Sequence, residues 1–154
     1  MIIRPGGSAD LAAVRGVFAR AARAAYTSIL TPQQLYAMTA DWRELEPTHR
    51  LLVADTGDAV VGFVYVGPGE RPGLGYVFDL FVDPPWHAFG VAASLMEAAH
   101  GAMTELGITE RLLWVLDGND RAAAFYRRHG WTHDGTRVMS SRGVERLRYR
   151  HALV

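Results

Sequence analysis

The feature that most constrains the fold is the stretch VDPPWHAFGVAASLM, residues 82–96, in which an apolar run stops at two prolines before an alanine-rich helix. Pro84 and Pro85 cannot donate to a sheet ladder, so the strand must end or leave its neighbour there. The first amides of the following helix have no intrahelical partner, and the helix dipole makes them a ready anion site. Gly90 lets the backbone approach such a ligand closely. An ordinary strand-to-helix turn, whose glycine only relieves strain, remains the alternative.

Composition excludes several classes of protein. The chain has 154 residues, enough for one domain over residues 1–154 with a sizeable core. Sixteen acidic residues balance sixteen basic ones, all of them arginines, so neither nucleic acid nor a membrane is an expected partner. The lack of cysteine excludes disulfides, thiolate metal sites and cysteine nucleophiles. Without a signal peptide or an apolar run of membrane-spanning length, a cytoplasmic protein is expected.

The order of the predicted elements indicates an α/β layer with a mixed sheet, because antiparallel strands come first and a β-α-β-α segment follows. Ser8 is predicted to cap the first helix, and Thr31 the second, where Pro32 occupies the first helical position. Gly107 is predicted to end the third helix. The expected strands are residues 1–4, 51–55, 60–66, 76–83, 111–117, 131–140 and 144–153, and the Pro/Gly-rich segment 67–75 is expected to be a loop. The expected helices begin near residues 8, 32, 90 and 119, and the first and the third carry an apolar stripe at helical spacing.

A second candidate site lies in the segment LLWVLDGNDRAAAFYRRHGW, residues 112–131. Asn119 is placed to cap a helix or to hydrogen-bond a ligand held between neighbouring strands. Tyr126 follows two helical turns later and therefore lies on roughly the same face. A tyrosine at such a position is far more often a core or surface residue than an acid catalyst, so this segment alone does not decide the function.

Together, the two segments resemble the signatures of the GCN5-related N-acetyltransferase (GNAT) superfamily, and the resemblance extends over nearly the whole chain. The first signature, Gln/Arg-x-x-Gly-x-Gly/Ala after a strand ending in V-x-P, corresponds to Val82-Asp83-Pro84 and then His87-Ala88-Phe89-Gly90-Val91-Ala92. The later signature corresponds to Asn119, Ala122, Phe125-Tyr126 and Gly130-Trp131. The resemblance implies an α/β (α+β) fold whose mixed, mostly antiparallel sheet has about seven strands flanked by about four helices. A splayed pair of parallel strands in that sheet would bind coenzyme A.

The resemblance also implies an acetyl-CoA-dependent N-acetyltransferase that moves an acetyl group directly to a primary amine of a small molecule or amino acid derivative. Acetyl-CoA would be the co-substrate, and no metal would be needed. The backbone N–H of Leu80 would stabilise the developing oxyanion, and Tyr126 would donate a proton to the departing thiolate. The implied acetyl-CoA contacts are Leu80, Phe81, Val82, His87, Ala88, Phe89, Gly90, Val91, Ala92, Ala93, Asn119, Ala122, Phe125 and Tyr126.

The chain departs from the family pattern in the phosphate-binding segment and at the position of the general base. In the first, Ala88 replaces a common glycine and Phe89 is bulkier than the usual polar residue. His87 stands where Gln or Arg is usual; a neutral imidazole can donate one hydrogen bond to a phosphate, and a protonated one adds charge. Tyr76 occupies the position at which many relatives carry a Glu or His base, and a tyrosine is not a base at neutral pH. Strand alternation puts Asp79 on the opposite face from Tyr76, Phe78 and Leu80, where it could polarise a water or pair with an arginine.

The acceptor is the least constrained part of the hypothesis. In the family it lies between the first two helices and the last two strands, so Tyr26 and Trp42 are candidate substrate residues, and Tyr76 and Asp79 of the central strand are added to them. Carboxylates suit a cationic amine and arginines suit an acid, so charge leaves the acceptor open. A protein N-terminal or lysine acetyltransferase, or a non-catalytic acyl-CoA sensor module, remain alternatives. Trp131 and the C-terminal strand could form a homodimer surface or pack internally.

Two other classes are excluded by the sequence. A dinucleotide-binding enzyme would need a G-x-G-x-x-G motif after the first strand, which is missing. A metal hydrolase would need clustered ligands, but the six histidines are scattered and none forms a helix-spaced pair with a carboxylate.

Overall fold

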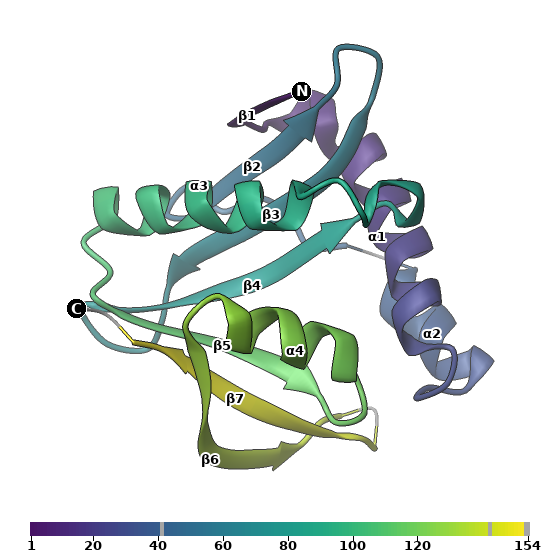
Figure 1. The fold of residues 1–154 in the computed structure, drawn as a ribbon, viewed down its shortest axis with the longest axis vertical. Helices are drawn as coiled ribbons and strands as arrows, with labels where there is room; N and C mark the ends of the chain where they lie inside the picture. Colours follow the sequence, from purple (N-terminus) through teal and green to yellow (C-terminus); the bar gives the residue numbers. More distant parts are fainter. Residues whose placement is uncertain (41, 142, 153–154) are drawn as a thin grey trace.

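The computed structural model describes residues 1–40, 42–141 and 143–152 and contains a seven-stranded mixed sheet with helices on both faces (Figure 1). The strands are β1 (Ile2–Pro5), β2 (Arg50–Asp55), β3 (Val60–Pro68), β4 (Leu74–Val82), β5 (Glu110–Leu116), β6 (Trp131–Met139) and β7 (Glu145–His151). The helices are α1 (Leu11–Tyr26), α2 (Pro32–Thr39), α3 (Val91–Glu105) and α4 (Asp120–Arg128), with short 3-10 turns at Ser8–Asp10 and Pro84–Trp86.

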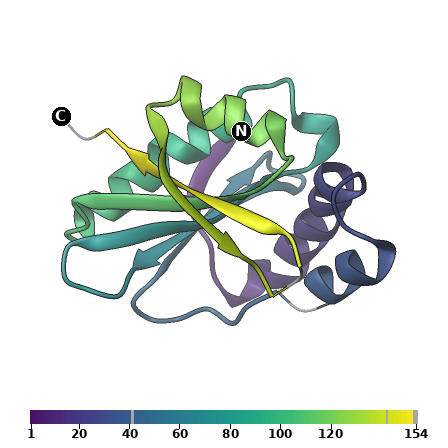
Figure 2. The ribbon, with the colours of Figure 1, turned by 90° about the horizontal axis from the view of Figure 1, so that it is seen from below.

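The strand order is β1-β2-β3-β4-β5-β7-β6, and every neighbouring pair is antiparallel except β4 and β5. Helices α3 and α4 lie on one side of the sheet, and α1 and α2 lie on the other (Figure 2). The α/β fold with about seven strands and four helices, expected from the sequence, is therefore confirmed. The parallel pair sits in the middle of the sheet, where α3 provides the crossover.

Each face of the sheet has its own hydrophobic core. Under α3 and α4 the core contains Val64, Leu95, Met103, Leu113 and Trp131, and under α1 and α2 it contains Val17, Phe18, Trp42, Phe63 and Tyr65. The sequence left Trp131 either at a dimer surface or packed internally. Its side chain is only 1% exposed, so in the described chain it packs internally. The apolar stripes predicted for α1 and α3 face these two cores.

The helix starts follow the capping signals in one case and depart from them in another. Thr31 caps α2 as predicted: its hydroxyl accepts from Gln34 N–H at 3.1 Å, and the Gln34 side chain accepts from Thr31 N–H at 2.8 Å. The prediction that Ser8 caps the first helix is wrong, because Ser8 lies inside a 3-10 turn that precedes α1. The Asp10 carboxylate instead accepts the Gly7 N–H at 2.9 Å.

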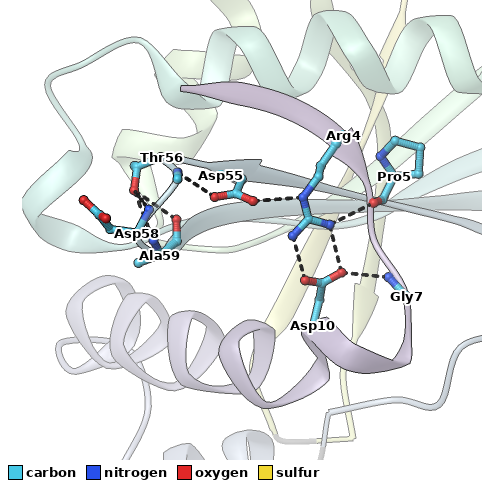
Figure 3. A network of polar contacts seen from close by, with 9 residues as sticks. Arg4, Pro5, Gly7, Asp10, Asp55, Thr56, Asp58 and Ala59 are labelled. Atoms are coloured by element: carbon cyan, nitrogen blue, oxygen red, sulfur yellow. Dashed lines mark hydrogen bonds and ion pairs between the residues drawn. The ribbon is translucent and has the colours of Figure 1, made fainter.

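A network centred on Arg4 fixes this start of α1 against the sheet (Figure 3). The Arg4 guanidinium donates from Nε to Asp55 at 2.9 Å and from its two terminal nitrogens to Asp10 at 2.9 and 3.1 Å. These hydrogen bonds, with that from Gly7 N–H, hold the pKa of Asp10 below its usual value. One guanidinium therefore joins β1, β2 and the segment leading into α1, the helix that carries Tyr26 to the site.

Strand β4 contains a β-bulge at Phe78. Asp79 lies opposite Tyr65 on β3, but Val77 lies opposite Val66, so Phe78 has no partner of its own. Because a bulge resets the alternation of side chains, Asp79 points to the α1/α2 face together with Phe78, and Leu80 points to the α3/α4 face. The prediction that Asp79 lies on the opposite face from Tyr76 and Phe78 is therefore wrong.

Strand β4 also begins two residues earlier than expected, at Leu74. Gly75 belongs to the Pro/Gly-rich segment that suggested a loop, but it pairs with Pro68 on one side and Arg111 on the other. A Cβ at Gly75 would lie 2.5 Å from the side chain of Ile108. This glycine is needed for close packing within the sheet rather than for a turn.

Candidate functional site

The parallel strands β4 and β5 separate along their length. They pair only from Leu74 to Val77 on β4 and from Glu110 to Leu113 on β5, while β5 stays paired with β7 as far as Leu116. Beyond these pairs the strands enclose a cleft of about 1100 Å³, bordered by residues of α1, α3 and α4. The sheet thus has an opening at its centre, with unpaired strand backbone on its walls.

The cleft brings together most of the site residues predicted from the sequence. Those that line it are Leu80, Phe81, Val82, His87, Gly90, Ala92, Ala93, Asn119, Ala122, Phe125, Tyr126, Tyr26 and Asp79. Those that do not line it are Ala88, Phe89, Val91, Trp42 and Tyr76. Of these five, Val91 and Trp42 are core residues, 1% and 5% exposed. Phe89 is a surface residue whose ring packs against Trp86.

The N-terminus of α3 opens into the cleft. Gly90 caps the helix with φ +72°, a left-handed conformation that other residues adopt only with strain, and its position has open space around it. The amides of the first turn, from Val91 onward, have no intrahelical acceptor, and the small side chains of Ala92 and Ala93 leave them accessible. This set of N–H donors at the positive end of a helix dipole fits a phosphate group.

His87 contributes differently from the simplest expectation. Its Nε2 lies 2.8 Å from the carbonyl oxygen of Val82, so this nitrogen donates to the end of β4. A hydrogen bond from the ring to a phosphate would then require a proton on the other nitrogen, Nδ1. Asp83, which follows Val82 directly, accepts two hydrogen bonds from the guanidinium of Arg20 on α1, both at 2.9 Å. These contacts fix the turn between β4 and α3.

Four polar groups, from α1, β4 and α4 with its N-cap, meet inside the cleft: Tyr26, Asp79, Asn119 and Tyr126. Asn119 caps α4 by accepting the Ala122 N–H at 3.4 Å, and its side chain lies near the hydroxyl of Tyr26 at the end of α1. Burial raises the pKa of Tyr26 to about 12, with the charge of Asp79 adding to the rise and Asn119 opposing it. Burial raises the pKa of Tyr126 still further above its usual value, and Tyr26 and Asp79 add to it. Both phenols therefore keep their protons at neutral pH.

Asp79 is the buried acid of the cleft. Its side chain is 12% exposed, and one carboxylate oxygen lies 3.0 Å from Nε of Arg43. Burial raises the pKa of Asp79, while the charge of Arg43 and the indole of Trp42 oppose the rise. The sequence left two roles for Asp79, an ion pair with an arginine and proton transfer. Asp79 forms the arginine pair, and its raised pKa keeps it a candidate for proton transfer.

The Asp79→Asn variant tests this assignment through stability. A carboxyl group whose pKa is raised by folding stabilises the protein at low pH and loses that contribution as pH rises through the folded-state pKa. We expect the free energy of unfolding of Asp79→Asn to fall less than that of the wild type as pH rises from about 4, near the unfolded pKa of aspartate. Chemical denaturation at several pH values measures the free energy of unfolding. The control is Asp58→Asn, because Asp58 is an exposed residue in a turn. A variant with the wild-type pH profile would contradict the raised pKa.

Tyr76 lies outside this cluster. Its side chain is 8% exposed, and its hydroxyl donates to the carboxylate of Glu70 at 3.0 Å. Trp114 of β5 and Arg146 of β7 also line the cleft, although the sequence patterns did not place them in this site. Their signal is alternation, because it puts both side chains on the same face of neighbouring strands.

The sequence profile of the acetyltransferase (GNAT) family matches residues 17–131. The chain belongs to this family. Two curated relatives of the chain are mycothiol acetyltransferases. The one from Propionibacterium freudenreichii subsp. shermanii is 32% identical over 103 residues, and the one from Pseudarthrobacter chlorophenolicus is 31% identical over 106 residues. Each alignment covers 66% of this chain and 32% of the relative. The chain thus spans about a third of the length of these proteins.

Solved structures show the same GNAT fold. The PaiA N-acetyltransferase of Thermoplasma acidophilum, in complex with coenzyme A, superposes with a TM-score of 0.82 at 15% identity, covering 99% of this chain and 98% of that one. A ribosomal-protein-alanine N-acetyltransferase from Brucella melitensis gives 0.74 at 20% identity, covering 99% and 100%. At these identities the likeness extends to the fold alone.

No three His, Cys, Asp or Glu side chains within residues 1–40, 42–141 and 143–152 are grouped so that they could hold a metal ion. In the same part of the chain no helix is both long and apolar enough to cross a membrane.

Proposed function

We propose that the protein is an acetyl-CoA-dependent N-acetyltransferase that acts on a primary amine of a small molecule or amino acid derivative. The observation that carries the proposal is the cleft between β4 and β5, which runs into the open N-terminus of α3. This combination suits an extended, phosphorylated ligand. The unpaired strand backbone can hydrogen-bond the extended part of the ligand, and the free amides can bind its phosphates.

Binding would divide between the two ends of the cleft. The amides of the first turn of α3 would hold the pyrophosphate, and the backbone of β4 from Leu80 to Val82 would pair with the pantetheine arm. Asn119 would contact the same arm from α4. Since His87 donates to the Val82 carbonyl, this strand end is held in place before a ligand arrives.

The chemistry would use groups that the fold already positions. Acetyl-CoA supplies the thioester; the amine nitrogen forms the new bond to the acetyl carbon as the carbon–sulfur bond breaks. The backbone N–H of Leu80 is our candidate for stabilising the negative charge that develops on the carbonyl oxygen. Tyr126 would give its proton to the departing sulfur, and its raised pKa keeps that proton available at neutral pH. The proton lost by the amine would leave through Asp79 or water.

Titration calorimetry with acetyl-CoA, coenzyme A and NADH is the direct test. Binding of acetyl-CoA without binding of NADH supports the assignment, and release of the coenzyme A thiol with a panel of amines would establish the enzyme. Binding without turnover on small amines, N-terminal peptides or lysine peptides would favour an acyl-CoA sensor. Failure of acetyl-CoA to bind at millimolar concentration would overturn the proposal.

The Gly90→Ala variant tests the helix mouth. A side chain at φ +72° costs about 1–2 kcal/mol and would turn the first amides of α3 away from the cleft. We expect acetyl-CoA to bind about tenfold more weakly or worse. Gly101→Ala is the matched control, because Gly101 lies within the same helix with open space around it and should leave binding unchanged. Equal binding by the two variants would show that the phosphates lie elsewhere.

A further inference from the structure

The cleft also opens toward α2 on the α1/α2 face of the sheet. Its walls there include Phe78 of the bulge, Trp114 of β5 and Arg146 of β7. The register of β5 and β7 pairs Trp114 with Arg148 and Leu116 with Arg146, so these four side chains share one face. This part of the cleft is separate from the N-terminus of α3, which belongs to the other face.

Arg146 is held in place without a counter-charge. Its guanidinium carbon lies 4.2 Å from the centre of the Trp114 ring, which fixes the group by a cation–π contact. Its Nε is buried and has no hydrogen-bond acceptor among the described residues. No described carboxylate lies within salt-bridge distance of it. The neighbouring Arg148 on the same face differs, because it donates to Asp134 at 2.6 Å.

A buried donor without an acceptor is costly, because the group has lost its water and gained nothing in exchange. A ligand that brings an acceptor would remove this cost. The planar guanidinium fork matches the two oxygens of a carboxylate, and such charge-assisted pairs are among the stronger hydrogen bonds in proteins. Asp79 cannot serve, since it is already paired with Arg43.

We propose that the acceptor is an amine that also carries a carboxylate or similar anionic group, which Arg146 binds over the ring of Trp114. This inference rests on the proposed function and specifies its substrate class. The apolar lining from Phe78 and Met38 suits a hydrocarbon portion between the amine and the acid. A polycationic acceptor is disfavoured, because it would bring further positive charge to an uncompensated arginine.

Matched acceptors test the proposal by turnover. Phenylalanine and phenylalaninamide differ in the anionic group, and the assay is release of coenzyme A thiol from acetyl-CoA. We expect kcat/KM for the acid to exceed that for the amide by about tenfold or more, mainly through KM. The Arg146→Gln variant should lose this preference, and Arg146→Lys should keep part of it. Arg150→Gln is the control: Arg150 lies on the same strand but outside the cleft and pairs with Glu110.

A binding measurement covers the case in which neither compound is acetylated. The chain has four tryptophans, and Trp114→Phe identifies the indole N–H signal of Trp114 in a nitrogen–proton spectrum. We expect 3-phenylpropionate to shift this signal in the wild type but not in Arg146→Gln, and 3-phenylpropanamide to leave it in place. No shift with the carboxylate, or equal shifts with both probes, would overturn the proposal. Absence of acetyl-CoA binding would instead count against the function itself.

Discussion

Replacing Tyr126 with phenylalanine is expected to lower kcat about a hundredfold or more while leaving the affinity for acetyl-CoA nearly unchanged. The substitution removes only the hydroxyl, so the ring keeps its edge contact with Phe125 at 5.5 Å and with Trp131 at 6.4 Å. The loss should therefore appear in the transition state rather than in binding. Steady-state kinetics with any accepted amine, together with calorimetry, separates the two quantities.

Tyr149→Phe is the matched control for this experiment. Tyr149 is 4% exposed, lies in the core on β7 and is not part of the cleft. Its variant should retain wild-type kcat. If Tyr126→Phe also turns over at the wild-type rate, the sulfur receives its proton from another group, and Tyr26, whose raised pKa also keeps it protonated, would be the next residue to test.

The largest effect on stability is expected from Leu95→Ala. Leu95 is fully buried, and it anchors α3 against the sheet among Val64, Leu113 and the other residues of that core. Truncation removes three carbons and leaves a cavity, so the free energy of unfolding should fall by about 3–5 kcal/mol. Chemical denaturation of the purified protein measures the change.

Glu97→Ala is the control on the same helix. Glu97 is exposed, and its replacement should change stability by no more than about 0.5 kcal/mol. A small loss for Leu95→Ala would mean that the surrounding side chains collapse into the space. Because α3 bears the amides of the proposed phosphate site, a variant that remains folded also reports whether the position of this helix controls binding.

Most of the fold follows from local signals in the sequence. Val60 to Val66 and the segment after Glu110 are β-rich runs, and Gly107, with φ +74°, stops α3 where predicted. The predictions are wrong where a residue type that usually marks a turn or a helix cap has another structural role. Gly75 suggested a loop, but it is a strand residue whose missing side chain makes room for Ile108. Ser8 suggested a cap, but it lies within a 3-10 turn, and the Asp10 carboxylate accepts the Gly7 N–H and pairs with Arg4.

The site was predictable where it depends on motifs and unpredictable where it depends on register. Gly90 and Asn119 carry recognisable patterns, and both line the cleft. Asp79 was placed on the wrong face because alternation assumes an unbroken ladder, and no local signal marks the bulge at Phe78. The basic cluster from Arg146 to His151 could be read from the sequence as able to serve an anionic ligand, but which arginine lacks a hydrogen-bond acceptor is a property of the packed chain.

The gap between β4 and β5 gives this sheet an inner edge. Unpaired strand backbone at the outside of a sheet is a template for aggregation, and proteins ordinarily shield it. Here the exposed backbone lies at the centre of the sheet, with α1 on one face and α3 and α4 on the other. A slender ligand can reach it, whereas the flat sheet of another molecule would meet the helices first. The fold can thus offer strand hydrogen bonds to a small molecule without offering them to its own copies.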